Sequence, residues 1–365
     1  MDGCVFERGI FYVLCGHSQV LFSSMNLALE IKQRFPELVI HENAPLSNCT
    51  TFRLGGPCPL LIDNPPADQL PALIQIFNKN GMKFLVIGQG SNLVIADKGL
   101  DCAVIRFCSE TPNVQTKTLP GLRPPLRQRG TETIPSGGGG REARGGSPVT
   151  VSGNTLLEDF SRITVEQALG DLAYCTGIPG TVGGGIAGNA GAFGRQVGDH
   201  LVSAEILDLD GAVRTVTRDE LEFSYRHSRL KETGEIVLSA TFQLPPESPG
   251  VLKAERQRIL DFRNEHHPDW HEMPCAGSVF KNVEPTSAVE RRKAAGHFLE
   301  EAGAKRMTIG GAKVFEKHAN IIIGGPGCSA QDVWDLSEQM KQAVFKTSGI
   351  ELVREVRFPG FEKHI

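Results

Sequence analysis

The chain has 365 residues, of which 40% are hydrophobic, and a formal net charge of -4 at pH 7. This length suits two domains, or one large domain with additions. A slightly acidic protein lacks the basic excess of a nucleic-acid-binding surface, and no apolar run reaches the roughly 18 residues of a membrane span. We therefore expect a globular protein with neither nucleic-acid nor membrane partners.

The nine cysteines are scattered and form no CxxC pair, so the sequence predicts no metal site and no disulfide framework. Reduced thiols are typical of a cytoplasmic protein. The short apolar run at 11–15 is interrupted by polar residues and precedes no cleavage site, which makes a secretory signal the less favoured alternative. We expect an N-terminal extension, with Met25 as the working start.

Residues 48–108 alternate short apolar runs with one amphipathic segment. A helix is predicted over about 67–80, where apolar residues recur at helical spacing, and Gly81 ends it. Runs that are apolar throughout are typical of strands buried on both faces, which favours a β-α-β beginning. Such strands are expected at 60–62, 84–87, 93–95 and 103–107.

Residues 109–148 interrupt this pattern with prolines, glycines and arginines and with no aromatic residue. This composition predicts a disordered insertion, whose arginines suit a solvated loop better than an anionic partner. A strand is expected again at 149–151. Asn154 or Thr155 is then expected to cap a helix.

The remaining elements follow from apolar runs, caps and turn residues. Asp210 and Gly211 predict a hairpin turn, prolines at 245–249 mark a boundary, and Ser329 with Asp332 predicts a capped long helix ending near Gly349. Strands are expected at 204–209, 213–216, 236–238, 240–244, 321–323 and in a last stretch through Val356, and helices at about 251–264 and 293–302.

The glycine-rich run at 177–194 is the most informative stretch. Glycines add backbone entropy and bury no side chain, so the run is predicted to be neither a packed helix nor a regular strand. Successive backbone N–H groups can instead form a nest for a pyrophosphate. The alternative is a flexible exposed loop, which the interleaved apolar residues Ile178, Val182 and Phe193 disfavour.

A dinucleotide-binding fingerprint occurs within this run, because residues 183–188 match GxGxxG and Asp208 follows at a suitable distance. Its context does not fit a Rossmann fold, since no buried strand precedes it and Asn189 would break a helix starting there. A second glycine loop at 87–93 joins one apolar strand to another, with Ser91 and Asn92 as side-chain donors. Two such nests could hold an extended dinucleotide between them.

Several short motifs occur in order between about residues 43 and 360. The segments are Thr50-Thr51-Phe52-Arg53-Leu54-Gly55-Gly56, 88–93, 177–184, 189–194, Ser224-Tyr225-Arg226-His227-Ser228-Arg229-Leu230-Lys231, Ala276-Gly277-Ser278-Val279-Phe280-Lys281-Asn282, 309–312, 316–320 and Glu355-Val356-Arg357. Together they resemble one family, that of UDP-N-acetylenolpyruvoylglucosamine reductase.

The resemblance implies an α+β fold. It implies a two-lobed FAD-binding domain of the vanillyl-alcohol-oxidase (PCMH) type over 43–245, interrupted by the insertion, and a smaller α+β substrate-binding domain over 246–365. Residues 1–42 would form the N-terminal extension. The short stretch at 316–323 resembles the more compact of two forms of this enzyme, and a monomer is expected.

The implied activity is the NADPH-dependent reduction of a UDP-sugar, UDP-N-acetylglucosamine enolpyruvate, to UDP-N-acetylmuramate through bound FAD. This reaction serves peptidoglycan precursor synthesis in the cytoplasm. Three alternatives remain: an FAD-dependent oxidase or dehydrogenase of another sugar or alcohol, a non-catalytic nucleotide-binding protein with a decayed site, and a Rossmann dehydrogenase. A flavin spectrum separates the last from the enzymes that use FAD.

The resemblance also implies residue roles. Arg226 would be the electrophile, since guanidinium stays charged and binds a carboxylate through two donors. Ser278 would be the proton donor and Glu355 the catalytic glutamate. From the residues alone, a surface ion pair, a turn residue and a solvated strand face are the plainer interpretations of these three.

Further matches imply contacts with substrate and cofactor. Tyr225, Lys281 and Asn282 would bind the substrate. The implied cofactor-binding residues are Gly55, Gly56, Gly88, Gln89, Gly90, Ser91, Asn92, Leu93, Pro179, Gly180, Thr181, Gly183, Gly184, Asn189, Gly191 and Ala192.

Three features depart from the family pattern. The insertion interrupts the FAD domain, residues 283–285 replace an asparagine-proline step, and Arg354 stands where the family usually has proline. None removes a reacting group. Arg354 is expected to influence Glu355, its neighbour in the chain.

Overall fold

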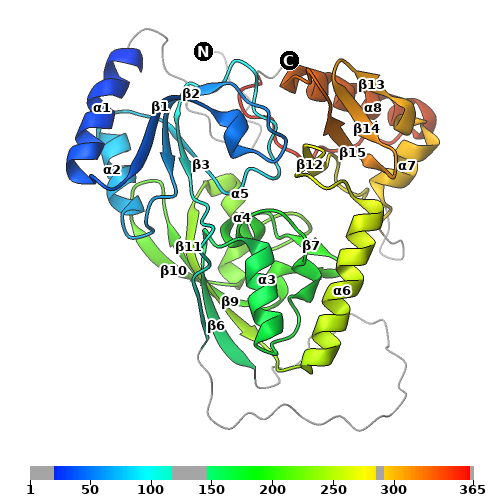
Figure 1. Cartoon of the computed structure of the whole chain (residues 1–365), viewed down its shortest axis with the longest axis horizontal. Coiled ribbons are helices and arrows are strands. Elements are labelled where there is room, and N and C mark those ends of the chain that lie inside the picture. Colours follow the sequence, from blue (N-terminus) through cyan, green and yellow to red (C-terminus); the bar gives the residue numbers. More distant parts are fainter. Residues whose placement is uncertain (1–19, 117–145, 285–291, 362–365) are drawn as a thin grey trace, which may run out of the picture. The chain divides into compact units, whose positions relative to one another are not determined.

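The computed structural model describes residues 20–116, 146–284 and 292–361, with the side chains of 20–25 left aside (Figure 1). It divides into two compact units. The first takes the chain up to Cys108, the turn Asp208–Ala212 and the chain from Phe262, and the second takes Ser109–Leu207 and Val213–Asp261. The apolar run at 11–15 and most of the predicted insertion, at 117–145, lie outside the described residues.

The first unit contains a four-stranded sheet near the N-terminus, in the order β1-β2-β4-β3. β1 pairs antiparallel with β2, whereas β4 runs parallel to both β2 and β3. The predicted helix is α2, whose apolar stripe is buried, and Gly81 follows it at φ 62. The elements are α1 (Val20–Arg34), β1 (Val39–Pro45), η1 (Leu46–Cys49), β2 (Pro57–Asp63), α2 (Leu70–Lys79), β3 (Phe84–Ile87) and β4 (Ala103–Arg106).

The predicted strand at 93–95 is wrong. This segment belongs to an irregular stretch between β3 and β4. Leu93 forms an isolated parallel β-bridge with Arg357. The Val94 N–H donates to the Arg357 carbonyl at 2.9 Å. Because the partner lies more than 260 residues away, the apolar run correctly indicated burial but not a regular strand.

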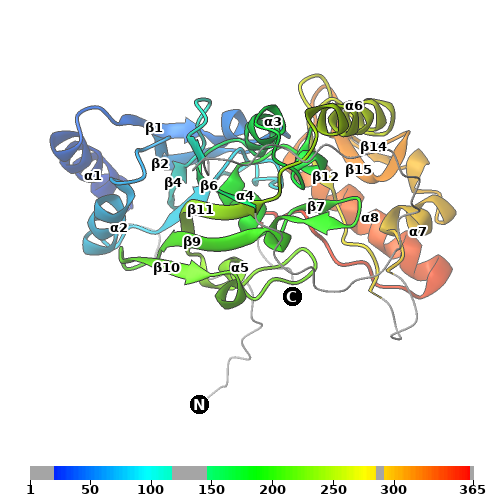
Figure 2. The same cartoon turned by 90° about the horizontal axis from the view of Figure 1, so that it is seen from below.

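A second sheet of the first unit is antiparallel, in the order β12-β15-β14-β13. Helices α7 and α8 lie against it in Figures 1 and 2, sharing an apolar core that includes Leu299, Ile322 and Leu336. The elements are β12 (Cys275–Ser278), α7 (Ala295–Glu301), η5 (Ala304–Arg306), β13 (Thr308–Ile309), β14 (Ala312–Phe315), β15 (His318–Gly324) and α8 (Ala330–Ser348).

The ends of α8 are as predicted. Ser329 and Asp332 form a reciprocal capping box, and Gly349 ends the helix at φ 70. The predicted last strand through Val356 is wrong, because residues 351–361 form only isolated bridges, including one between Phe280 and Arg354. The chain there changes its hydrogen-bonding partner every few residues, from Val279 at Glu355 to Asn92 at Arg357.

The second unit is built on a five-stranded antiparallel sheet in the order β10-β9-β11-β6-β5. Helices α3, α4 and α6 contribute Phe160, Ile186 and Ile259 to its core. The elements are β5 (Val114–Thr116), β6 (Ser147–Ser152), α3 (Leu157–Glu166), η2 (Ala173–Cys175), α4 (Val182–Ala187), β7 (Gly191–Ala192), β8 (Arg195–Gln196), η3 (Val197–Asp199), β9 (Leu201–Leu207), β10 (Val213–Thr217), η4 (Asp219–Leu221), α5 (Leu230–Thr233), β11 (Ile236–Leu244) and α6 (Pro249–His266).

Three predictions in this unit need correction. β5 and the first residues of β6 lie inside the range assigned to a disordered insertion. The two strands expected at 236–238 and 240–244 are one strand, interrupted in register between Val237 and Ser239. The N-cap of α3 is Leu156, since Asn154 and Thr155 instead accept hydrogen bonds from Ser152 Oγ and the Asn113 N–H.

The glycine-rich run also differs from expectation, because residues 182–187 form the short helix α4. Thr181 caps it by accepting the Gly184 N–H at 3.2 Å, and Gly183 packs close to backbone, since a Cβ there would lie 3.0 Å from the Gly153 carbonyl oxygen. Close packing thus offsets the helix cost of glycine. The 3-10 turn η2, not a strand, precedes the run by one residue, which confirms that the Rossmann context is missing.

Over residues 20–116, 146–284 and 292–361, no helix has the length and apolarity that crossing a membrane requires. The same residues contain no group of three metal-ligating side chains. Burial raises the pKa of Cys58 to about 11 and that of Cys102 to about 12, so both core thiols stay protonated.

Candidate functional site

The first glycine loop, residues 88–93, follows β3 in the first unit. Gly90 adopts φ +67, and a Cβ there would lie 2.2 Å from the Cys49 carbonyl oxygen. Gly56 is similarly constrained, since its Cβ would lie 2.1 Å from the Asp97 carbonyl oxygen. These glycines therefore allow backbone to approach backbone, whatever ligand the loop holds.

The C-terminal segment runs beside this loop. The Arg357 N–H donates to the Asn92 carbonyl at 3.0 Å, and the Asn92 side-chain amide donates to the Glu355 carbonyl at 3.1 Å. The Glu355 N–H in turn donates to the Val279 carbonyl at 2.8 Å. Asn92, Glu355 and the residue after Ser278 are thus brought together from three distant parts of the chain.

Asn320, which the sequence did not single out as a site residue, supports the segment that carries Ser278. Its side chain accepts the Phe280 N–H at 2.9 Å and donates to the Phe280 carbonyl at 2.8 Å. Its own carbonyl accepts the Val279 N–H, and the residue is 3% exposed. The only available signal was its place at the end of the motif 316–320.

Lys281 and Asn282, which are predicted to bind the substrate, come directly after Phe280 in the chain. The Lys281 N–H donates to the Val353 carbonyl at 2.9 Å, which ties it to the Glu355 segment. The Asn282 side-chain oxygen accepts the Ala295 N–H at 3.2 Å, at the start of α7. Part of the Asn282 amide therefore serves the local structure.

Arg354 is anchored on α8. Its guanidinium carbon lies 4.0 Å from the centre of the Trp334 ring, its Nε donates to Ser337 Oγ at 3.0 Å, and it pairs with Glu338. Burial lowers the pKa of this guanidinium. The arginine thus fixes the backbone next to Glu355 through side-chain contacts, where a proline would restrict the backbone directly.

In the second unit, the glycine segment 177–184 is held chiefly by residues 153–158. The N–H groups of Val182 and Gly183 donate to the carbonyls of Thr155 and Gly153, each at 2.8 Å. Gly184 donates to the Thr181 hydroxyl. The predicted phosphate contacts of Gly183 and Gly184 would therefore share N–H groups that the fold already uses.

Asn189 links the glycine run to the turn that carries Arg226. Its buried amide donates to the carbonyls of the Gln196 side chain and the Ser224 backbone at 2.9 and 2.8 Å, and its oxygen accepts the Gly198 N–H at 3.1 Å. Arg226 has φ 54, an uncommon backbone conformation for a residue with a side chain. Its carbonyl accepts the Lys231 ammonium at 2.6 Å.

The predicted site residues thus fall into two groups. The first unit holds Ser278, Lys281, Asn282 and Glu355, whose segments share backbone hydrogen bonds and reach Asn92 through Glu355. The second holds Tyr225 and Arg226, in the turn to which Asn189 donates. Neither glycine-rich stretch, 88–93 or 177–184, contains an acidic residue. Backbone amides, hydroxyls and side-chain amides form a donor set that fits a pyrophosphate.

Comparison with known proteins identifies the family of this chain. A family profile described as the C-terminal domain of UDP-N-acetylenolpyruvoylglucosamine reductase matches residues 268–359. The reductase of that name from Agathobacter rectalis is 33% identical over 90% of this chain and 97% of its own length. The chain belongs to the UDP-N-acetylenolpyruvoylglucosamine reductase family.

Further reductases share the likeness. The Bacillus subtilis reductase is 32% identical over 91% of this chain and 97% of its own length. The crystal structure of the Thermus caldophilus reductase has a TM-score of 0.66 and 25% identity, covering 88% of this chain and 99% of that one. The family and the α+β fold expected from the motifs are confirmed.

Proposed function

We propose that this protein is an FAD-dependent reductase that uses NADPH to reduce UDP-N-acetylglucosamine enolpyruvate to UDP-N-acetylmuramate, a peptidoglycan precursor. The main support is likeness to reductases over about nine-tenths of the chain. The juxtaposition of the Glu355 backbone with the segment that carries Ser278 adds to it. The proposal includes a monomer that acts in the cytoplasm.

The residues proposed to hold FAD lie in the loop 88–93, at Gly55 and Gly56, and in the segments 179–184 and 189–192. Their donor set is neutral and free of carboxylates, which suits a pyrophosphate. When bound, FAD supplies hydride transfer from NADPH to the substrate. The chain contributes orientation, charge and proton transfer.

Arg226 is proposed to bind the substrate carboxylate, with Tyr225 beside it. Hydride addition to one alkene carbon leaves negative charge delocalised into that carboxylate, and a permanently charged guanidinium stabilises it. The Arg226 guanidinium carbon lies 5.6 Å from the centre of the Tyr225 ring. The φ of 54 at Arg226 agrees with a functional constraint on this turn.

Ser278 is proposed to donate the proton that the second alkene carbon needs. A serine hydroxyl is a weak acid, but an enediolate-like intermediate is a strong base. Lys281 would favour the alkoxide that remains, and Glu355 would assist protonation. Asn282 would contact the substrate through its amide.

The experiment separates the two half-reactions under anaerobic conditions. NADPH should bleach the flavin band near roughly 450 nm, and UDP-N-acetylglucosamine enolpyruvate should restore it within seconds. Ser278→Ala should leave bleaching unchanged and slow reoxidation by about 100-fold or more. Ser348→Ala, on a helix end in the same unit, is the matched control.

Each alternative has its own result. A flavin that NADPH reduces but that ignores this acceptor would indicate an enzyme for another sugar or alcohol. Purified protein without flavin, and unable to take it up, would overturn the FAD assignment. Equal reoxidation rates for Ser278→Ala and wild type would remove Ser278 from the mechanism.

A further inference from the structure

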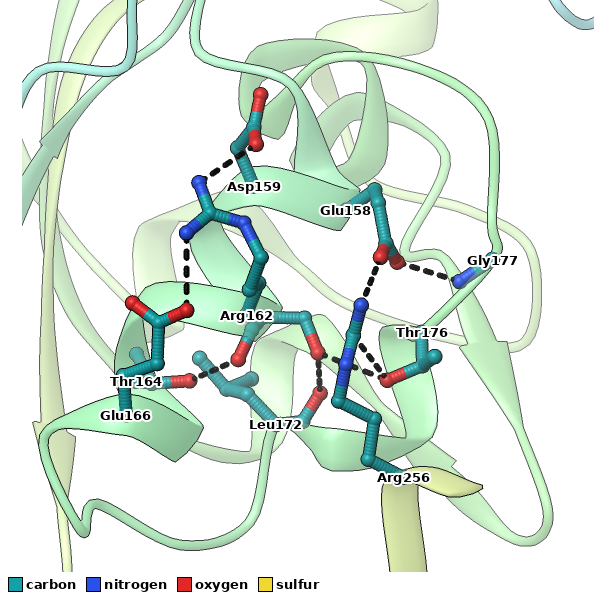
Figure 3. Close-up of polar contacts among 10 residues, drawn as sticks. Glu158, Asp159, Arg162, Thr164, Glu166, Leu172, Thr176, Gly177 and Arg256 are labelled. Atoms are coloured by element: carbon teal, nitrogen blue, oxygen red, sulfur yellow. Dashed lines mark hydrogen bonds and ion pairs between the residues drawn. The ribbon is translucent and has the colours of Figure 1, made fainter. Parts of the chain in front are cut away.

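A polar network in the second unit joins α3, α6 and the start of the glycine segment (Figure 3). Arg256 of α6 donates to the Thr176 hydroxyl at 2.9 Å and pairs with the Glu158 carboxylate of α3. The other Glu158 oxygen accepts the Gly177 N–H at 2.6 Å. The network therefore holds Thr176 and Gly177 by hydrogen bonds at the point where the glycine segment begins.

The surroundings make these contacts stronger than ordinary surface pairs. Thr176 is fully buried, and its hydroxyl lies 3.2 Å from that of Ser161, which donates to the Leu172 carbonyl at 3.0 Å. The Arg256 side chain is 18% exposed and that of Glu158 36%. Partial burial reduces screening by solvent and salt, so the pair contributes more than an exposed pair would.

Thr176 and Gly177 begin a segment that has two further backbone contacts, from the Ile178 N–H to the Cys175 carbonyl and from the Leu157 N–H to the Gly180 carbonyl, each at 2.9 Å. Gly177 has φ +70 and Gly180 has φ +134, conformations that glycine adopts among many others. Binding to an unfixed segment costs the entropy of ordering it, whereas a segment fixed beforehand avoids that cost. Contacts at Thr176 and Gly177 can therefore raise affinity for a ligand that they do not touch.

We propose that Arg256 and Glu158 are positioning residues that preorganise residues 177–181 for the pyrophosphate of FAD. This inference rests on the proposed function, which supplies the assignment of FAD to this segment. No role is predicted for either residue from the sequence, because the two lie 98 positions apart on two helices. Both act through Thr176 and Gly177.

The test measures the dissociation constant of FAD by flavin fluorescence after the apoprotein is prepared. Arg256→Met should weaken FAD binding by about 10-fold, the effect expected of a residue that acts through a network. Arg256→Lys should recover part of the affinity. Glu158→Gln should lose less than Arg256→Met, since its amide oxygen can still accept the Gly177 N–H.

Arg162→Met is the matched control. Arg162 also lies on α3 and pairs with two carboxylates, Asp159 and Glu166, but it is 41% exposed and does not contact the glycine segment (Figure 3). Its FAD affinity should equal that of wild type. Hydrogen exchange of the ligand-free protein should be faster at 176–181 in Arg256→Met and unchanged in Arg162→Met.

Two results would overturn the inference: wild-type FAD affinity in both Arg256→Met and Glu158→Gln, or faster exchange throughout the unit, which indicates general destabilisation. If Arg256→Met does not fold, Glu158→Gln alone decides between these results. Wild-type protein that binds no FAD would overturn the proposed function. That outcome is distinct from FAD binding that the substitutions leave unchanged.

Discussion

The two glycine-rich segments are supported in different ways. In the first unit, the C-terminal segment holds the end of the loop 88–93 and the residues after it: the Asn92 carbonyl accepts the Arg357 N–H at 3.0 Å, and the N–H groups of Val94 and Ala96 donate to the carbonyls of Arg357 and Pro359, each at 2.9 Å. In the second unit, residues 177–184 are held chiefly by residues 153–158. One segment thus depends on the far end of the chain, and the other largely on its neighbourhood.

This difference indicates what each segment can tolerate. Gly90 of the first lies where backbone packs against backbone, whereas the helix α4 within the second leaves Gly184 room for a methyl group. The first segment is therefore expected to be sensitive both to glycine substitution and to changes near the C-terminus. The second should respond mainly to changes in α3 and α6.

The largest effect is expected from a matched pair of glycine substitutions. Gly90→Ala should lower the free energy of unfolding by about 3 kcal/mol or more, because its Cβ would overlap the Cys49 carbonyl at a positive φ. Gly184→Ala should change it by less than about 0.5 kcal/mol, since the nearest atom is Thr181 Oγ1 at 3.4 Å and alanine favours helices. Urea denaturation measures the free energy of unfolding of both variants. Equal losses in the two would contradict the difference proposed between the two glycine-rich segments.

The next largest effect is expected from a substitution that removes contacts of the C-terminal segment. Arg354→Met should lower the free energy of unfolding by about 2 kcal/mol, because it removes a partly buried cation from Trp334 and leaves Glu338 without its ion pair. It should also slow flavin reoxidation by the substrate, because Glu355 is adjacent. Lys341→Met, which removes a more exposed pair with Glu351, is the control and should change neither quantity appreciably.

Acid is expected to affect the first unit through His267. Burial, with Arg263, His318 and His266 nearby, lowers the pKa of His267 to about 4. Between pH 6.5 and 4 the unfolded chain binds the proton more readily, so stability is complete above about pH 6.5 and falls as pH drops through this window. The expected loss is about 2 kcal/mol after allowance for partial exposure.

Urea midpoints at pH 7.5 and 4.5 measure this loss. His267→Gln should reduce the difference between the two midpoints, and hydrogen exchange at low pH should rise first in the first unit. The same dependence on pH in wild type and His267→Gln would show that other groups carry it.

A smaller effect is expected at Asp97, which follows the first loop. Its carboxylate accepts the N–H groups of Ala330 and Gln331 at 2.9 and 3.1 Å, at the start of α8. Asp97→Ala should cost about 1 kcal/mol, the usual contribution of a helix cap. Asp335→Ala, farther along α8, is the control, and thermal unfolding of both variants would expose any general effect of charge removal.

The site was predictable from sequence to the extent that its motifs are contiguous. Ser278, Arg226 and Glu355 each lie in a short family motif, and their catalytic roles remain predictions. Arg256 lies in no such motif and Asn320 only ends one, and both act through hydrogen bonds to other segments. A contact of this kind leaves no periodic or compositional signal.

The sequence by itself determined the features that depend on neighbours in the chain: the stripe and glycine stop of α2, the capping box of α8, and the family to which the motifs belong. Tertiary structure decided that residues 93–95 form no regular strand and that 182–187 form a helix. The physical reasons differ between the two cases. Backbone hydrogen bonds to distant segments, and close packing around glycine, outweigh local preference.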